Sequence, residues 1–149
     1  MLIADKRKIA KAGWYGLIAG IILSIVFKLI EQITQVKVYT LLLNVDYIPI
    51  INRYYFPEII EVSFHLVVSI LLSMVLLAVL QHERVTTGGH ILAWCTAICT
   101  LIGLLLFPTT AFSDRTPAVT SIPALSYWLA GHALYGLVLG FLFKRDRQL

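Results

Sequence analysis

The stretch "EVSFHLVVSILLSMVLLAVLQHER", residues 61–84, decides the fold class, because its apolar run is as long as a membrane is thick. A helix of about 20 residues crosses the roughly 30 Å of hydrocarbon in a bilayer. Three other blocks are similar, so the sequence predicts four spans, at about 12–30, 62–80, 90–107 and 123–143. We therefore expect an all-α, four-transmembrane-helix bundle that forms a single membrane domain over residues 1–149.

The composition agrees with a membrane protein and gives its orientation. Hydrophobic residues make up 59% of the chain and charged residues 13%, against roughly 25% charged residues in a soluble domain. The net charge of +4 does not indicate a nucleic-acid partner, because the basic residues lie at span ends and not on one basic face. Basic residues favour the cytoplasmic side of a membrane, so we predict that both termini are cytoplasmic. Eight basic residues then lie inside: Lys6, Arg7, Lys8, Lys11, Arg84, Lys144, Arg145 and Arg147.

Two longer links are predicted on the outer side, at about 31–61 and 108–122. The first is rich in tyrosine, a side chain that suits the headgroup region because its ring can be dry while its hydroxyl is wet. A re-entrant segment is the alternative for this link. The tyrosines concerned are Tyr39, Tyr47, Tyr54 and Tyr55.

A second stretch, "WLAGHALYGLVLGFLFKRDR", residues 128–147, repeats the pattern of the first, with a histidine followed by small residues at every fourth position. This repetition predicts two similar antiparallel hairpins. In lipid, helices associate through close backbone approach, so small residues spaced by four indicate packing faces inside the bundle. The predicted packing residues are Gly16, Gly20, Ser73, Gly136 and Gly140. The third span offers a similar strip at Ala93, Ala97 and Thr100.

Ionisable residues inside a membrane indicate a functional site, because they are costly to bury there. Histidine also titrates near neutral pH. The leading hypothesis is therefore a polar niche that senses protons or assists the passage of protons or of a small solute. The predicted niche residues are His65, His132, Glu58, Glu61, Lys28 and Ser69.

Several alternatives remain for these residues. The histidines can be packing residues that bond to neighbouring carbonyls in a structural or partner-binding module, and Lys28 can reach the headgroups by itself. A metal site at Glu58, Glu61, His65 and His132 is a third interpretation, and haem ligation is disfavoured because no C-x-x-C-H motif is present. No catalytic motif appears, so we expect neither an enzyme nor a cofactor. Cys95 and Cys99 are predicted to be buried apolar residues.

Five segments, "LIAGIILSIVFK", "SFHLVVSILL", "LLLFPTTAF", "TPAV" and "LAGHALYGLVLGFLFKRD", resemble segments that occur in the same order in the YagU-like family of bacterial inner-membrane proteins. The resemblance covers most of the chain but not the first outer link. It implies a multi-pass protein of the bacterial inner membrane and lends no reaction. Independently of the resemblance, the expected partners are the lipid bilayer and a second copy or another membrane protein. The matching positions are Gly20, His65, Ser69, Phe107, Pro108, Pro117, Gly131 and His132.

Overall fold

The computed structural model describes residues 6–45 and 56–146, and all regular secondary structure in these ranges is helical. Four of the helices are long and apolar enough to cross a membrane, which confirms the all-α prediction with four long apolar helices. They are α1 (Lys6–Thr34), α3 (Glu58–His82), α4 (Gly88–Leu106) and α5 (Ile122–Arg145). Two short elements, α2 (Val38–Leu43) and the 3-10 helix η2 (Phe107–Phe112), accompany them. Tyr47, Tyr54 and Tyr55 lie outside the described residues.

All four long helices begin earlier than the predicted apolar spans, and α1, α3 and α5 also end later. The helix α1 starts at Lys6, where we expected a span from about 12, and it ends at Thr34 instead of about 30. A helical backbone satisfies its own hydrogen bonds, so it continues past the hydrocarbon into the interface, where charged side chains are tolerated. Hydropathy therefore marks the apolar part of each helix and not its ends.

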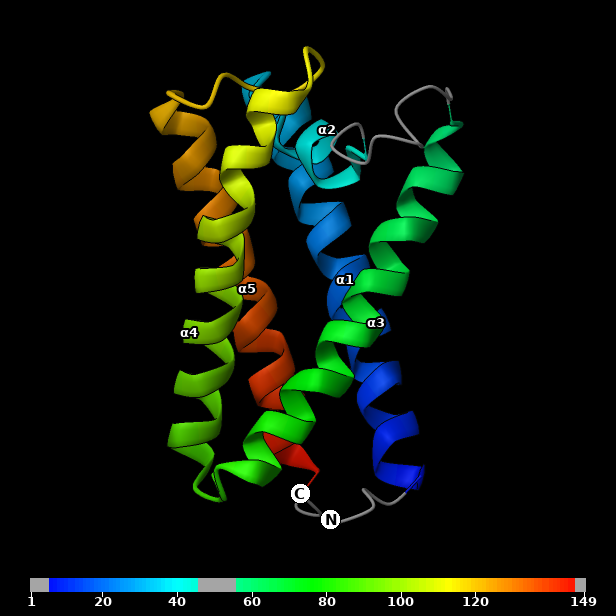
Figure 1. Cartoon of the computed structure of the whole chain (residues 1–149), viewed down its shortest axis with the longest axis vertical. Helices are drawn as coiled ribbons and strands as arrows, with labels where there is room; N and C mark the ends of the chain where they lie inside the picture. Colours follow the sequence, from blue (N-terminus) through cyan, green and yellow to red (C-terminus); the bar gives the residue numbers. More distant parts are fainter. Residues whose placement is uncertain (1–5, 46–55, 147–149) are drawn as a thin grey trace.

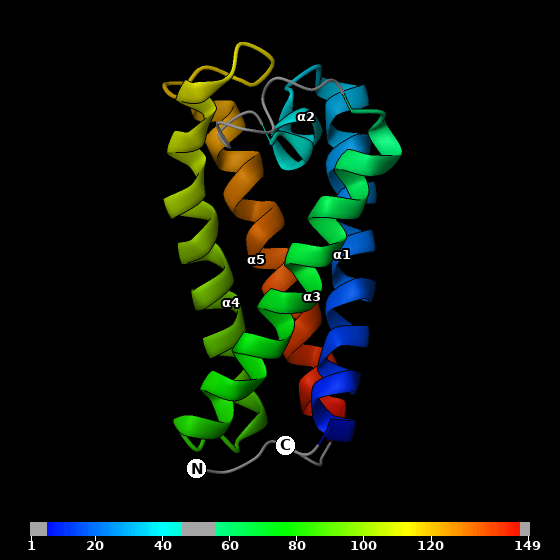
Figure 2. The same cartoon turned by 45° about the vertical axis from the view of Figure 1, so that its right-hand side comes forward.

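The bundle consists of two antiparallel pairs, α1 with α3 and α4 with α5, which meet along α1 and α5 (Figures 1 and 2). The helices α3 and α4 follow each other along the chain but touch at few positions. The start of α1 and the end of α5 lie at one end of the bundle, which we call the terminal end, and α2 and η2 lie at the other, the capped end (Figure 1). The side of the membrane that each end faces stays a prediction, as does the similarity of the two hairpins.

The first pair, α1 and α3, packs at close range through glycine and serine. A Cβ atom added at Gly16 would lie 2.6 Å from the carbonyl oxygen of Ser69, so only glycine fits there without a shift. The Ser69 hydroxyl donates a hydrogen bond of 2.8 Å to the Gly16 carbonyl, and the Ser73 hydroxyl donates one of 2.7 Å to that of Ala12. Serine side chains thus bond directly to the backbone of the facing helix, as small residues in membranes allow.

The second pair, α4 and α5, also packs through glycine, but the face that α4 contributes differs from the predicted one. A Cβ atom at Gly136 would lie 2.5 Å from the Cys95 carbonyl oxygen. Cys95 is completely buried, whereas Ala93 and Ala97 are exposed, so the predicted strip on the third span is wrong. Residues two positions apart lie about 200° apart around a helix, so only one of these two sets can face α5.

Candidate functional site

A cavity of about 130 Å³ lies in the capped half of the bundle, and we call it the histidine cavity. It lies between α3, α4 and α5 and beneath the last turn of α2. Leucine, valine, isoleucine and phenylalanine side chains make up much of its wall, and polar residues come from every side. The polar and tryptophan residues of the wall are Asn44, Glu61, His65, Ser69, Thr109, Trp128, His132 and Tyr135.

His132 is held rigidly on α5. Its Nδ1 atom lies 2.9 Å from the carbonyl oxygen of Trp128, and because a carbonyl only accepts, this nitrogen carries the proton. The imidazole and the Trp128 ring are 4.3 Å apart at their centroids, and Phe27 stacks on Trp128 from α1 at 5.5 Å. The imidazole also lies against Gly103, where a Cβ atom would come within 2.6 Å of it. In the neutral ring, Nε2 is therefore left with a lone pair.

His65 is oriented by the same kind of contact. Its Nε2 atom lies 3.3 Å from the carbonyl oxygen of Gly20 on α1, so it donates to that oxygen and leaves a lone pair on Nδ1. Neither this lone-pair nitrogen nor the one of His132 has a hydrogen-bond partner in the described part of the chain. Two hydrogen-bond acceptors are thus present on two helices that line one cavity.

Ser69 and Tyr135 close the cavity towards the terminal end. The Tyr135 hydroxyl donates a 2.9 Å hydrogen bond to the Ser69 carbonyl, which joins α5 to α3. Below this contact the bundle interior is filled with fully buried apolar side chains, including Leu76, Leu139 and Phe143. The cavity therefore ends at the Ser69–Tyr135 contact.

Glu61 lies in the cavity wall but is already paired. Its carboxylate accepts two hydrogen bonds from the Arg115 guanidinium, at 2.8 and 3.2 Å. The Glu61 side chain is 5% exposed and that of Arg115, in the loop after η2, is 40% exposed. A bidentate contact of this kind satisfies the hydrogen-bonding capacity of a buried carboxylate well. The pair also ties this loop to the first turn of α3.

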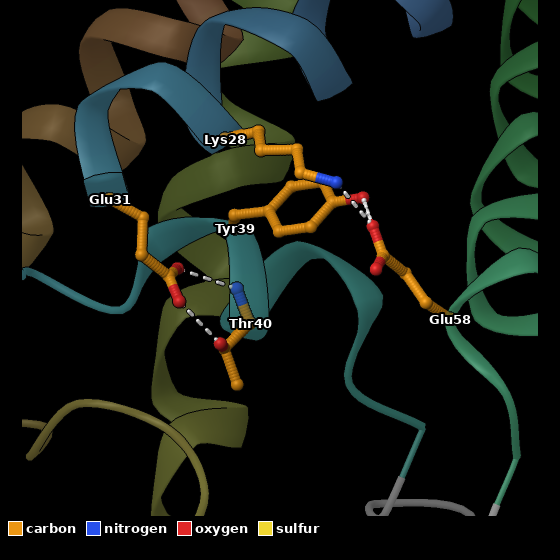
Figure 3. Close-up of polar contacts among 5 residues, drawn as sticks. All are labelled: Lys28, Glu31, Tyr39, Thr40 and Glu58. Atoms are coloured by element: carbon orange, nitrogen blue, oxygen red, sulfur yellow. Dashed lines mark hydrogen bonds and ion pairs between the residues drawn. The ribbon is translucent and has the colours of Figure 1, made fainter.

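Lys28 and Glu58 form a separate site, so the predicted niche divides into two. The Lys28 ammonium lies 2.7 Å from the Glu58 carboxylate, and the Tyr39 hydroxyl donates a 2.8 Å hydrogen bond to the same oxygen (Figure 3). The ammonium also lies 5.3 Å from the centre of the Tyr39 ring, within the range of a cation–π contact. Burial, followed by the hydrogen bond to Glu58, raises the pKa of Tyr39 above its ordinary value. None of these three residues lines the histidine cavity.

Glu31 holds α2 in place above the cavity. Its two carboxylate oxygens accept from the backbone N–H and the hydroxyl of Thr40, at 2.8 and 2.7 Å (Figure 3). The first N–H groups of a helix have no partner within the helix, and a carboxylate satisfies them well. The cap of α2 is thus supplied by a neighbouring helix, since Lys37 before it makes no side-chain cap.

The metal alternative finds no set of ligands in the described ranges. No group of three or more histidine, cysteine, aspartate or glutamate side chains in residues 6–45 and 56–146 is arranged to hold a metal ion. Of the four ligands considered from the sequence, Glu58 is bonded to Lys28, and Glu61 is bonded to Arg115. The two histidines remain, and the lone-pair nitrogen of each has no hydrogen-bond partner among the described residues.

Sequence reasoning missed three residues that shape the site. Tyr135 and Trp128 lie three residues after and four residues before His132, so helical spacing alone places all three on one face. That signal was present in the sequence. Arg115 is 54 residues from Glu61 in a loop, and no spacing rule connects them.

Comparison with known proteins identifies no relative of this chain. No family model matches the chain, and no curated protein or solved structure shows significant similarity to it. The resemblance to the YagU-like family therefore stays a prediction.

Proposed function

We propose that this multi-pass membrane protein binds a small solute in the histidine cavity and that His65 and His132 couple binding to protonation. The observation that carries the proposal is that both imidazoles line one cavity, each with one N–H bonded to a backbone carbonyl and one lone pair left over. Protonation would turn each of these acceptors into a donor. A solute that donates hydrogen bonds would then bind the neutral form and leave the protonated form.

The apolar packing below the cavity favours binding over free permeation. Leu76, Leu139 and Phe143 fill the interior between Tyr135 and the terminal end, and water or protons would need a polar route there. We therefore place proton exchange at the capped side of the bundle. Passage across the membrane would require the two helix pairs to separate.

The basic residues support a cytoplasmic position for the terminal end. Lys8, Lys11 and Lys144 belong to the helix ends there, and Arg84 lies in the turn between α3 and α4. By the positive-inside rule this end faces the cytoplasm, so the histidine cavity would open in the outer half of a bacterial inner membrane. Fusions of a reporter enzyme to each terminus test this orientation. If a reporter that is active only outside the cytoplasm were active at either terminus, the orientation would be overturned.

The test of binding follows the two imidazoles directly. Protein labelled with nitrogen-15 at histidine, in lipid nanodiscs, is titrated with ethanolamine, glycerol and alkyl derivatives of both while ring nitrogen shifts are recorded. We expect at least one probe to move the signals of His65 and His132 together, with weaker binding at acidic pH. Assignment comes from the His65→Gln and His132→Gln variants, and the exposed His82 serves as the internal control. Signals that no probe moves would overturn the proposal.

A structural role for the histidines is the second candidate, and the packing of His132 favours it. Its ring fills the space over Gly103 and lies tilted against the Trp128 ring. If packing is the whole role, His132→Phe keeps helix assembly and every function of the protein, because phenylalanine also fills the space. If binding is the role, the same variant folds but no longer responds to the probes.

A further inference from the structure

We infer that the occupant of the histidine cavity is a single-chain amphiphile with a hydroxyl or ammonium head group, which enters sideways from the lipid between α3 and α4. This inference rests on the proposed binding function and adds the class of ligand to it. It depends on two properties of the cavity: where its wall is open, and which hydrogen-bonding groups are left over inside.

The cavity wall is open towards lipid. The helices α3 and α4 touch at few positions, and their ribbons diverge towards the capped end (Figures 1 and 2). Phe64 and Val68 of α3 and Leu106 of α4 all line the cavity, yet they are 37%, 56% and 41% exposed. In a membrane-spanning helix, such surface is in contact with acyl chains. A ligand that already lies in the membrane can therefore reach the cavity without crossing water.

Apart from the Asn44 amide, which carries both donors and an acceptor, the polar groups left over inside the cavity are acceptors. His65 and His132 each offer a lone pair on an imidazole nitrogen. The Thr109 hydroxyl donates to the Leu106 carbonyl at 2.7 Å, so its oxygen also remains an acceptor. The Glu61 carboxylate has its charge paired with Arg115, and its oxygens keep further lone pairs near the capped end.

Several donors that face the same space are already used. The Trp128 indole N–H donates to the Gly103 carbonyl at 2.7 Å, and the Ser69 hydroxyl donates to Gly16. The Tyr135 hydroxyl donates to Ser69. A head group that only accepts, such as an ester, would face acceptors and lose its hydrogen bonds to water. A hydroxyl or an ammonium supplies the missing protons.

The remaining wall suits an alkyl chain. Leu72 and Ile102 lie on α3 and α4 deeper than the exposed rim, and Leu23 closes the back from α1. The cavity volume of about 130 Å³ is close to that of a cavity that holds one benzene-sized ligand, so two acyl chains of a phospholipid are not expected inside.

Trp128 provides a reporter for the test, because it lines the cavity while Trp14 and Trp94, which are 61% and 40% exposed, face outwards. The background protein carries Trp14→Phe and Trp94→Phe and is placed in phosphatidylcholine nanodiscs. Chain-brominated dodecylamine, dodecanol and methyl dodecanoate are added, since bromine quenches indole fluorescence on contact. We expect saturable quenching by the amine and the alcohol, and binding of the ester that is weaker by about tenfold or more, the effect of one or two lost hydrogen bonds.

Histidine variants distinguish a failure of the amphiphile proposal from a failure of the binding function. The double variant His65→Phe, His132→Phe keeps aromatic volume, and we expect it to lose at least about tenfold in affinity for the amine. The exposed His82→Phe is the matched control and should bind as the background protein does; circular dichroism confirms folding of each. Equal quenching by the ester and the amine, or full affinity for the amine in the double variant, would overturn the proposal that the ligand is an amphiphile held by the two histidines. Histidine shifts with free ethanolamine but no quenching by any chain would overturn the amphiphile and keep the binding function, whereas neither response would overturn both.

Discussion

The packing of α1 on α3 predicts that Gly16→Ala destabilises the protein, although alanine is the better helix former. A Cβ atom at this position would lie 2.6 Å from the Ser69 carbonyl oxygen and 2.7 Å from Ser73 Cβ. Both atoms are fixed to the backbone of α3, so no change of rotamer relieves the contact. Ordinary contact begins at 3.4 Å, and α3 must therefore move away by about 0.8 Å.

A movement of this size has a definite cost. It lengthens the hydrogen bond from the Ser69 hydroxyl to the Gly16 carbonyl from 2.8 Å to about 3.6 Å, where it no longer counts as a hydrogen bond. Overpacking costs about 2 kcal/mol and the lost bond in a membrane protein about 0.6 kcal/mol, while alanine regains about 1 kcal/mol in helix propensity. The expected net loss is about 1.5 kcal/mol.

Gly89→Ala is the matched control, because a Cβ atom at Gly89 meets nothing within 4 Å and no glycine in the described part of the chain has positive φ. We expect this variant to gain up to about 1 kcal/mol. Unfolding by sodium dodecyl sulfate in mixed micelles, followed by circular dichroism, measures both. The packing argument would be refuted if Gly16→Ala were as stable as Gly89→Ala.

Three further predictions use the same unfolding assay or the histidine signals. Arg115→Ala should lower the free energy of unfolding by about 3 kcal/mol, because it leaves the Glu61 carboxylate buried without a cation. Glu61→Gln should lower it by only about 1 kcal/mol, since the Arg115 guanidinium is partly exposed and can be solvated. Equal losses of stability in the two variants would contradict this prediction. Tyr135→Phe should cost roughly 0.6–1.7 kcal/mol by removing the hydrogen bond between α5 and α3, and an unchanged stability would show that this contact contributes nothing. Gly103→Ala should shift the imidazole signals of His132, because its Cβ would lie 2.6 Å from the ring, and unchanged signals would refute the contact.

Sequence alone predicts the four long helices because the length of an apolar run is a local property. It also identifies Gly16, whose spacing from Gly20 and Ser24 places these small residues on one face of a helix. It does not decide which face of α4 is buried. The predicted burial of Cys95 and Cys99 is confirmed, whereas Ala93 and Ala97 of the predicted strip are exposed. Cysteine and alanine are both small and apolar, so only the contact with α5 decides between these two faces.

The candidate site was predictable to a smaller extent, because its members come from distant parts of the chain. His65, Ser69 and His132 stand out as polar residues within apolar runs, and all three line the cavity. Glu58 lies only three residues before Glu61, yet the two carboxylates bond to different cations. The choice between Lys28 and Arg115 as a partner depends on how the loop after η2 folds back, which no local pattern specifies.

Because Cys95 and Cys99 are buried between α4 and α5, the native thiols can report transient separation of these two helices. Both side chains are fully enclosed and neither forms a disulfide. A membrane-permeant maleimide can therefore alkylate them only while α4 and α5 are apart, and the labelling rate reports how often this second helix pair opens. Ligands that lock the bundle would slow this rate, so candidate compounds can be screened by mass spectrometry without introducing any foreign cysteine.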